Sequence, residues 1–253
     1  MLPKQRRTGL FSATQTNRLE DLMRAGLRNP VRVVISEQVD SHSPTRGPPG
    51  GLRTPAALQN FYAIVDPEVK FSTLIRFLLA HSNDKILCFL ATCACVDYFA
   101  RLVRKFLPKN RAKSVYALHR KLRKKRTAIF NAFRNQSAGV LICTDVMARG
   151  VDIPQVSWVL QCDPPTSANA FVHRCGRTAR CGAEGRALLF LAPNEVAYVN
   201  FLEINQKVQL TELLPKELDE MCAPALDGHL TPDAVTSRFR TLCKHDRYFY
   251  SLQ

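Results

Sequence analysis

From Asn60 onward, short apolar runs alternate with amphipathic segments along most of the chain. A run of roughly four to eight apolar residues is typical of a buried strand, whereas apolar residues every three to four positions predict a helix with one buried face. These patterns predict strands at 61–65, 86–91, 114–118, 140–143, 157–162 and 187–191, and helices at 68–81, 95–107 and 122–134. Such alternation favours an α/β fold, a parallel sheet with helices on both faces.

The flanking segments follow other patterns. Residues 7–14 and 31–35 predict strands and 17–25 predicts a short helix, so the chain starts with pieces of a further α/β unit. Residues 37–57 are rich in Pro and Gly and poor in apolar side chains, which predicts a linker. Its glycines lack the Gly-x-x-x-x-Gly-Lys-Ser/Thr spacing of a phosphate loop. After residue 205 two alternatives stay open, a short helical extension packed on the domain or disorder.

Charge and cysteine usage narrow the function classes. The 253 residues carry a net charge of +15, which points to a polyanionic partner. No apolar run is long enough to span a membrane, and the first residues lack the apolar core of a secretory signal. The nine cysteines do not follow metal-ligand spacing, and those in apolar runs behave as small hydrophobes, so no metal site is expected. Their odd number suggests a reducing compartment.

Two polar segments carry the candidate chemistry. The apolar run 140–143 ends in Thr144-Asp145, where side chains emerge from the carboxyl edge of the sheet, and ligands gather at such edges. Arg174, Arg177 and Arg180 are three residues apart, so on a helical turn they would share one face. Guanidinium groups match phosphate geometry. Surface salt bridges are the alternative, but residues 170–181 contain no acid to pair with them.

A long basic run is the second signal. No Asp or Glu occurs between Tyr98 and Thr144, although thirteen Lys and Arg residues fall there. Charge runs are usually solvated faces, but an uncompensated run near the proposed sheet edge favours an RNA-backbone footprint. Residues 120–126 also fit a nuclear-import signal, and the two interpretations are compatible.

These motifs resemble those of a known family. Residues 139–154 and the His-Arg-Cys-Gly-Arg-Thr-Ala-Arg segment at 173–180 resemble the fifth and sixth motifs of the DEAD-box RNA helicases. Ser12-Ala13-Thr14 resembles the third motif, and the resemblance covers roughly residues 3 to 205. The segments Phe-Ser-Ala-Thr-Gln-Thr and Cys-Thr-Asp-Val-Met-Ala-Arg-Gly-Val-Asp are similar to those of the nucleolar branch that acts in large ribosomal subunit assembly.

The resemblance implies a fold and a domain plan. The main block would be a RecA-like lobe of the P-loop NTPase type. The implied boundaries are 1–36 for a remnant of a first RecA-like lobe, 37–58 for a linker, 59–205 for the helicase C-terminal domain and 206–253 for a C-terminal extension. The implied location is the nucleus and nucleolus, and the implied partners are ATP, RNA (pre-ribosomal RNA) and a first lobe, with no membrane.

The resemblance also implies roles for single residues. Arg177 and Arg180 would be arginine fingers at the γ-phosphate of ATP. The residues expected to contact ATP are Gly150, Asp152, His173 and Arg174. The residues expected to couple the nucleotide state to RNA binding are Ser12, Ala13, Thr14 and Asp145. The residues expected to contact RNA are Thr92, His119, Lys124, Lys125, Arg126, Thr144 and Arg149. For Asp152 a turn or helix-cap role is the alternative.

The chain departs from the family in two ways. Relatives usually have His-Gly where this chain has His119-Arg120, and a bulky residue there costs on the order of 1 kcal/mol or more if φ is positive. The phosphate-binding lysine loop and the Asp-Glu-Ala-Asp motif for Mg²⁺ do not occur, so the Mg²⁺ ligands are expected on the first lobe. Two hypotheses follow: the second lobe of an ATP-dependent RNA helicase, or an RNA-binding or scaffold module without ATPase activity. The related DEAH group is a weaker fit, since it typically has Gln in place of His173.

Overall fold

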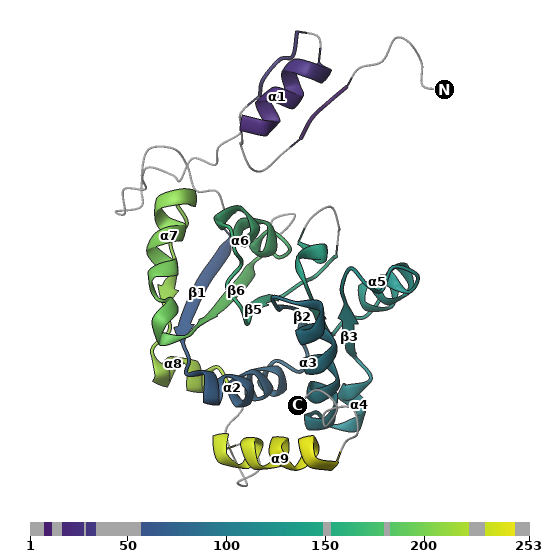
Figure 1. Ribbon diagram of the computed structural model, residues 1–253, viewed down its shortest axis with the longest axis vertical. Helices are drawn as coiled ribbons and strands as arrows, with labels where there is room; N and C mark the ends of the chain where they lie inside the picture. The colour runs from purple at the N-terminus through teal and green to yellow at the C-terminus, as the bar shows by residue number, and fades with distance from the viewer. Residues whose placement is uncertain are drawn as a thin grey trace. The chain divides into compact units, whose positions relative to one another are not determined.

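The computed structural model describes residues 8–11, 17–27, 29–33, 57–148, 153–179, 183–222 and 231–245 (Figure 1). The chain divides into two compact units, Met1–Arg53 and Thr54–Gln253.

The first unit contains one described helix, α1 (Asn17–Gly26), which confirms the helix predicted at 17–25. Residues 8–11 and 31–33 do not form strands, so the strand prediction is wrong for these residues; the rest of both predicted strands lies outside the described residues. A strand needs a neighbouring backbone to pair with. The described part of this unit offers none, and it leaves Phe11 95% exposed.

Seven parallel strands form the sheet of the second unit. They are β1 (Leu58–Ile64), β2 (Lys85–Phe89), β3 (Val115–Leu118), β4 (Gly139–Cys143), β5 (Trp158–Gln161), β6 (Gly185–Leu191) and β7 (Thr211–Glu212). Their order across the sheet is β3-β4-β2-β5-β6-β1-β7. Every residue of β2, β4 and β5 is buried, as expected for central strands covered on both faces. The α/β prediction is confirmed.

Helices cover both faces of this sheet (Figure 1). One hydrophobic cluster packs α2 (Pro67–Ala80) and α3 (Cys93–Phe106) on one face, and a second cluster packs α5 (Arg126–Arg134), α6 (Ala168–Cys175) and α7 (Ala197–Gln206) on the other. The short helix α4 (Lys109–Ala112) follows α3. Two 3-10 turns, Asp145–Met147 and Pro193–Glu195, follow β4 and β6.

Local sequence signals set where helices begin. The Thr92 hydroxyl caps α3 by accepting a hydrogen bond from the Cys95 amide at 3.1 Å. The helix predicted at 122–134 begins only at Arg126, because residues 119–125 form two successive turns closed by the Leu122 and Lys125 amides.

The C-terminal segment packs on this domain. Strand β7 extends the sheet beside β1. Asp219 of α8 (Pro215–Glu220) forms an ion pair with Arg76, with 2.6 Å between Asp219 Oδ1 and Arg76 Nη2. Helix α9 (Pro232–His245) lies against α2, with Phe239 6.2 Å from Phe71 between ring centroids (Figure 1). For these residues the structure shows the packed helical extension rather than disorder.

Candidate functional site

Four neighbouring strands end at one rim of the sheet. The carboxyl ends of β3, β4, β2 and β5 lead directly into turns that carry His119, Thr144 with Asp145, Thr92, and Asp163. The parallel arrangement places these turns side by side, as predicted for ligand-binding residues of an α/β sheet. We call this edge the carboxyl rim.

An ion pair between Arg174 and Asp145 lies at the centre of the rim. The Nε and Nη2 atoms of Arg174 donate to the two carboxylate oxygens of Asp145 at 2.5 and 3.2 Å. Nη1 donates to Gln161 Oε1 at 3.3 Å and to the Asp163 carbonyl at 2.8 Å, and the guanidinium lies 5.1 Å from the Phe89 ring centroid. Arg174 is 1% exposed, so it joins α6 to the turn after β4.

This arrangement corrects two expectations. Segment 170–181 indeed contains no acid, but Arg174 finds its acid in Asp145, 29 residues earlier in the chain. The ATP contact expected of Arg174 is not supported, because protein acceptors take four hydrogen bonds from its buried guanidinium. Helix α6 ends at Cys175, so Arg174 and Arg177 do not share the face of one helix as the spacing predicted.

Arg177 follows the end of α6. Its Nε donates to the His173 carbonyl at 3.2 Å, and both side chains are half-buried. This bond holds the Arg177 side chain against the last turn of α6, and part of the side chain stays accessible to solvent. The other residues expected to contact ATP or to couple the lobes, together with one RNA residue, lie outside the described residues: Ser12, Ala13, Thr14, Arg149, Gly150, Asp152 and Arg180.

The RNA residues predicted at the rim are mostly accessible. Thr92, Lys124 and Lys125 are exposed, and Thr144 is half-buried. Arg126 is also exposed, and its Nη2 donates to the Val146 carbonyl at 3.3 Å. This contact links the start of α5 to the turn that carries Thr144 and Asp145.

His119 differs from its prediction. The residue is 1% exposed, and its Nε2 lies 3.0 Å from Asp97 Oδ1 on α3, while its Nδ1 is buried without a hydrogen-bond partner. A direct RNA contact by this side chain is therefore not supported, and the histidine instead fixes the turn after β3. The neighbouring Arg120 is exposed and does not have a positive φ, so the strain considered for a non-glycine residue here does not arise.

Sequence reasoning missed Asp163, Gln161 and Asp97. The Asp163 carboxylate accepts the Ala91 amide at 2.8 Å and lies 3.5 Å from Lys70 Nζ, so it ties the turn after β2 to the turn after β5. The rule that singled out Asp145 also applies to Asp163, because it is the first acid after the apolar run 157–162. Asp97 gave no such signal, since it lies within a helix.

Two cysteines near this site, Cys143 and Cys175, are fully buried. Burial raises the pKa of the Cys143 and Cys175 thiols well above their usual range, although Arg174 opposes the shift. In the described part of the chain no group of three or more His, Cys, Asp or Glu residues could hold a metal ion. None of the helices that the structure describes is long and apolar enough to cross a bilayer.

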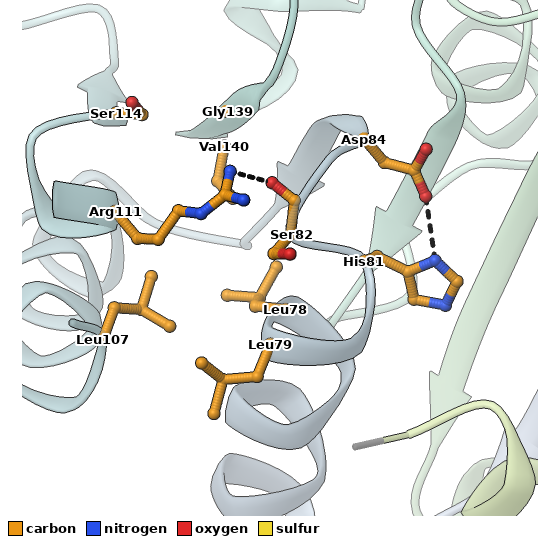
Figure 2. Close-up of a pocket in the computed structure, with 10 residues that line it drawn as sticks. All are labelled: Leu78, Leu79, His81, Ser82, Asp84, Leu107, Arg111, Ser114, Gly139 and Val140. Carbon is orange, nitrogen blue, oxygen red and sulfur yellow. Dashed lines mark hydrogen bonds and ion pairs between the residues drawn. The ribbon is translucent and has the colours of Figure 1, made fainter.

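A small hollow lies at the other end of the strands, where β2, β3 and β4 begin (Figure 2). Arg111 extends across it and donates to the Ser82 carbonyl and to Asn83 Oδ1, the latter at 2.9 Å. His81 Nδ1 lies 2.9 Å from Asp84 Oδ2 at its border. Because the chain's own guanidinium occupies this hollow, we interpret it as a packing feature.

Comparison with known proteins agrees with this geometry. Residues 69–182 match the helicase conserved C-terminal domain. ATP-dependent RNA helicase DDX55 of Danio rerio is 56% identical over 209 residues, which cover 83% of this chain and 34% of that protein. The Homo sapiens protein of the same name is 51% identical over 232 residues, covering 92% and 37%. The chain thus spans about a third of the length of these relatives.

Two solved structures share the fold. Dbp5 of S. cerevisiae bound to RNA and ADP BeF3 superposes with a TM-score of 0.63 at 26% identity, covering 93% of this chain and 56% of that one. Mss116p DEAD-box helicase domain 2 bound to an RNA duplex superposes with a TM-score of 0.54 at 26% identity, covering 74% and 78%.

The sheet, its helices and the carboxyl rim define a RecA-like α/β lobe, and residues 69–182 identify it as a helicase C-terminal domain. The chain carries the C-terminal helicase domain of the DEAD-box family, as the motif resemblance predicted, and is similar to this part of DDX55.

Proposed function

We propose that this chain acts as the second lobe of an ATP-dependent RNA helicase, which couples ATP binding and hydrolysis to RNA duplex unwinding or RNP remodelling. The observation that carries this proposal is the Arg174–Asp145 ion pair. Asp145 directly follows Thr144, an RNA candidate, and Arg174 is three residues before Arg177, an ATP candidate. This bidentate contact would therefore join the proposed RNA half of the site to the proposed ATP half.

On the ATP side, Arg177 and Arg180 would neutralise charge on the γ-phosphate, with Gly150, Asp152 and His173 near the nucleotide. Phosphoryl transfer depends mainly on positioning and on charge neutralisation, and an arginine finger can raise the rate by roughly 10³ to 10⁵. The first lobe would hold the Mg²⁺ ion, which would supply further charge neutralisation at the phosphates. This chain would contribute the arginines and the groups that orient them.

On the RNA side, six residues would contact the RNA backbone: Thr92, Thr144, Arg126, Lys124, Lys125 and Arg149. Hydroxyl and cationic groups bind phosphate without reading the base sequence. Asp145 and the segment Ser12–Thr14 would link the nucleotide state to this surface. The accessible positions of Thr92, Lys124 and Lys125 support this part of the proposal.

We also propose a role in large ribosomal subunit biogenesis, in the nucleus and nucleolus, with pre-ribosomal RNA as the substrate. The support is the similarity of the third and fifth motifs to those of the nucleolar branch. The basic segment 120–126 would serve nuclear import as well as RNA binding.

A two-lobe reconstitution tests the proposal. We expect this chain to restore RNA-stimulated ATP hydrolysis when mixed with a separately purified first lobe of a DDX55 relative, and neither lobe to hydrolyse ATP alone. Hydrolysis by the mixture that is no faster than by the first lobe alone would contradict the helicase assignment.

The second candidate is an RNA-binding or scaffold module without ATPase activity. The structure of Mss116p helicase domain 2 bound to an RNA duplex favours it, because it shows an isolated second lobe holding RNA. In the same reconstitution this candidate predicts tight RNA binding by the chain, with no stimulated hydrolysis after the first lobe is added.

A further inference from the structure

The acid-free run between Tyr98 and Thr144 contains two kinds of cation. Several arginines bond backbone carbonyls of their own domain. Arg104 donates to the Val115 carbonyl at 2.7 and 3.2 Å, Arg111 to the Ser82 carbonyl, and Arg126 to the Val146 carbonyl. The lysines of the run are instead exposed: Lys105, Lys109, Lys113, Lys121, Lys124 and Lys125. These three arginines therefore position elements, and the exposed lysines supply surface charge.

These exposed lysines fall at two places that β3 separates. Lys121, Lys124 and Lys125 follow the strand at the carboxyl rim, whereas Lys109 and Lys113 precede it. From Lys113 to Arg120 the chain advances seven residues, which spans about 23 Å if extended. Strand β3 is the edge of the sheet, so the two groups lie at opposite ends of one side of the domain.

Helix α9 adds further cations at the end away from the rim. Arg238 Nη2 donates to the Lys105 carbonyl at 2.7 Å, and its guanidinium lies 4.9 Å from the Phe106 ring centroid, which seats α9 on the last turn of α3. Arg240 and Lys244 are four residues apart, so they share one helix face, and both are exposed. Asp233 is the one acid of α9.

We propose that the end of α3, α4 and α9 form a second RNA-backbone-binding surface, separate from the carboxyl rim. Its cations are Lys105, Lys109, Lys113, Arg238, Arg240 and Lys244. This inference rests on the proposed RNA function and adds the substrate class: RNA longer than the stretch held at the rim, bound through the phosphates that flank it.

The charge pattern favours RNA as the occupant. Along the β3 side, one acid-free stretch of chain carries Lys105, Lys109 and Lys113 of the second surface as well as the lysines at the rim, so a continuous polyanion can follow it past both ends of the strand. Lysine binds phosphate as a flexible point charge, which suits contacts that do not read sequence. Direct bonding of Arg238 to α3 fixes where α9 presents its charges.

Two double variants of the full chain test the surface: Lys109→Glu with Lys113→Glu, and Arg240→Glu with Lys244→Glu. The matched control is Lys207→Glu with Lys216→Glu, because these exposed lysines flank β7 at the opposite edge of the sheet. Lys124→Glu with Lys125→Glu reports on the rim. Each protein is titrated with oligouridylates of about eight and about thirty nucleotides, lengths chosen below and above the usual site sizes of single-strand-binding domains.

We expect each test variant to bind the longer RNA about tenfold or more weakly, with a salt slope reduced by about 1.4 for two lost phosphate contacts. Binding of the shorter RNA should change by less than about twofold, whereas the rim variant should lose both RNAs. The surface is overturned if the test variants weaken neither RNA, weaken both equally, or behave like the control. Failure of the unmodified chain to bind either RNA overturns the RNA function itself, which separates the two proposals.

Discussion

Both oxygens of the Asp145 carboxylate accept hydrogen bonds from the Arg174 guanidinium, at 2.5 and 3.2 Å. The two partners differ in environment: the Arg174 side chain is 2% exposed and the Asp145 side chain 52% exposed. The arginine has little access to water, whereas the carboxylate keeps contact with solvent. The pair therefore fixes the position of a buried cation by means of an accessible anion.

Replacing the acid should destabilise the lobe. In Asp145→Asn the buried guanidinium keeps its neighbours Gln161 and Asp163 but loses its charge partner. Loss of one partner of a fully buried pair costs about 3–5 kcal/mol, and the exposure of Asp145 lets water compensate in part, so we expect about 2 kcal/mol. Urea denaturation measures this change. Glu184→Gln, at an exposed acid, serves as the control, and an equal midpoint for both variants would contradict a structural role of the pair.

Removal of the proposed finger should affect turnover. In the reconstituted two-lobe enzyme, Arg177→Ala should lower the rate of ATP hydrolysis by about 10³ or more, because charge on the γ-phosphate is no longer neutralised. RNA affinity should change by less than about twofold, since Arg177 is not among the rim cations. A stopped-flow phosphate assay and RNA titration measure the two quantities. Undiminished hydrolysis would remove the finger assignment.

Charge reversal at the rim should weaken RNA binding. Lys124 and Lys125 are exposed in the turn before α5, and only the backbone of Lys125 takes part in the hydrogen bonds of that turn. In Lys124→Glu with Lys125→Glu the slope of log affinity against log salt should fall by about 0.7 per lost phosphate contact for single-stranded RNA. Fluorescence anisotropy at several salt concentrations gives this slope. An unchanged slope would assign these lysines to a plain solvated surface.

Stability should decline at alkaline pH through the buried thiols. The usual thiol pKa is 9.0, and burial raises the pKa of Cys143 well above it. Below pH 9.0 both states hold the proton; above it the unfolded chain releases the proton first, so the free energy of unfolding falls by about 1.4 kcal/mol per pH unit for this thiol. In Cys143→Ala the free energy of unfolding should fall less steeply with pH between about pH 9 and 11.

The lost side-chain volume in Cys143→Ala lowers the free energy of unfolding by the same amount at every pH. Comparing the slopes of this free energy against pH therefore removes that effect. Cys93→Ala is the control, because Cys93 is only partly buried at the start of α3. Urea denaturation at each pH supplies the slopes. Equal slopes for the native chain and for Cys143→Ala would contradict the shift.

Most of the sheet could be predicted, because strands such as 86–91 and 140–143 are continuous apolar runs whose burial on both faces removes any ambiguity of period. Strand β7 could not be predicted: Thr211 and Glu212 are polar and exposed, and only pairing with β1 makes them a strand. The late start of α5 was missed for a similar reason. Apolar periodicity extends to Leu122, but the two hydrogen-bonded turns at residues 119–125 decide where the helix begins.

At the site, sequence spacing placed Asp145 and Thr144 correctly at the carboxyl rim and misjudged Arg174 and His119. Both are polar residues that the fold buries, with partners distant in sequence: Asp145 for Arg174 and Asp97 for His119. The sequence alone does not show which polar residues are buried, because their acids lie 29 and 22 residues away. Tertiary contacts decide between a ligand-binding and a positioning role.

The strand order also bears on how this lobe can be cut for experiments. Segment 69–182 contains β2, β3, β4 and β5, which are adjacent, while β6, β1 and β7 complete the other side of the sheet from residues beyond both ends of that segment. A recombinant fragment limited to 69–182 would leave β5 as an unprotected edge and would remove Arg186 from the indole of Trp158, and unpaired edges promote aggregation. The smallest soluble unit should therefore run from Leu58 at least to Leu213.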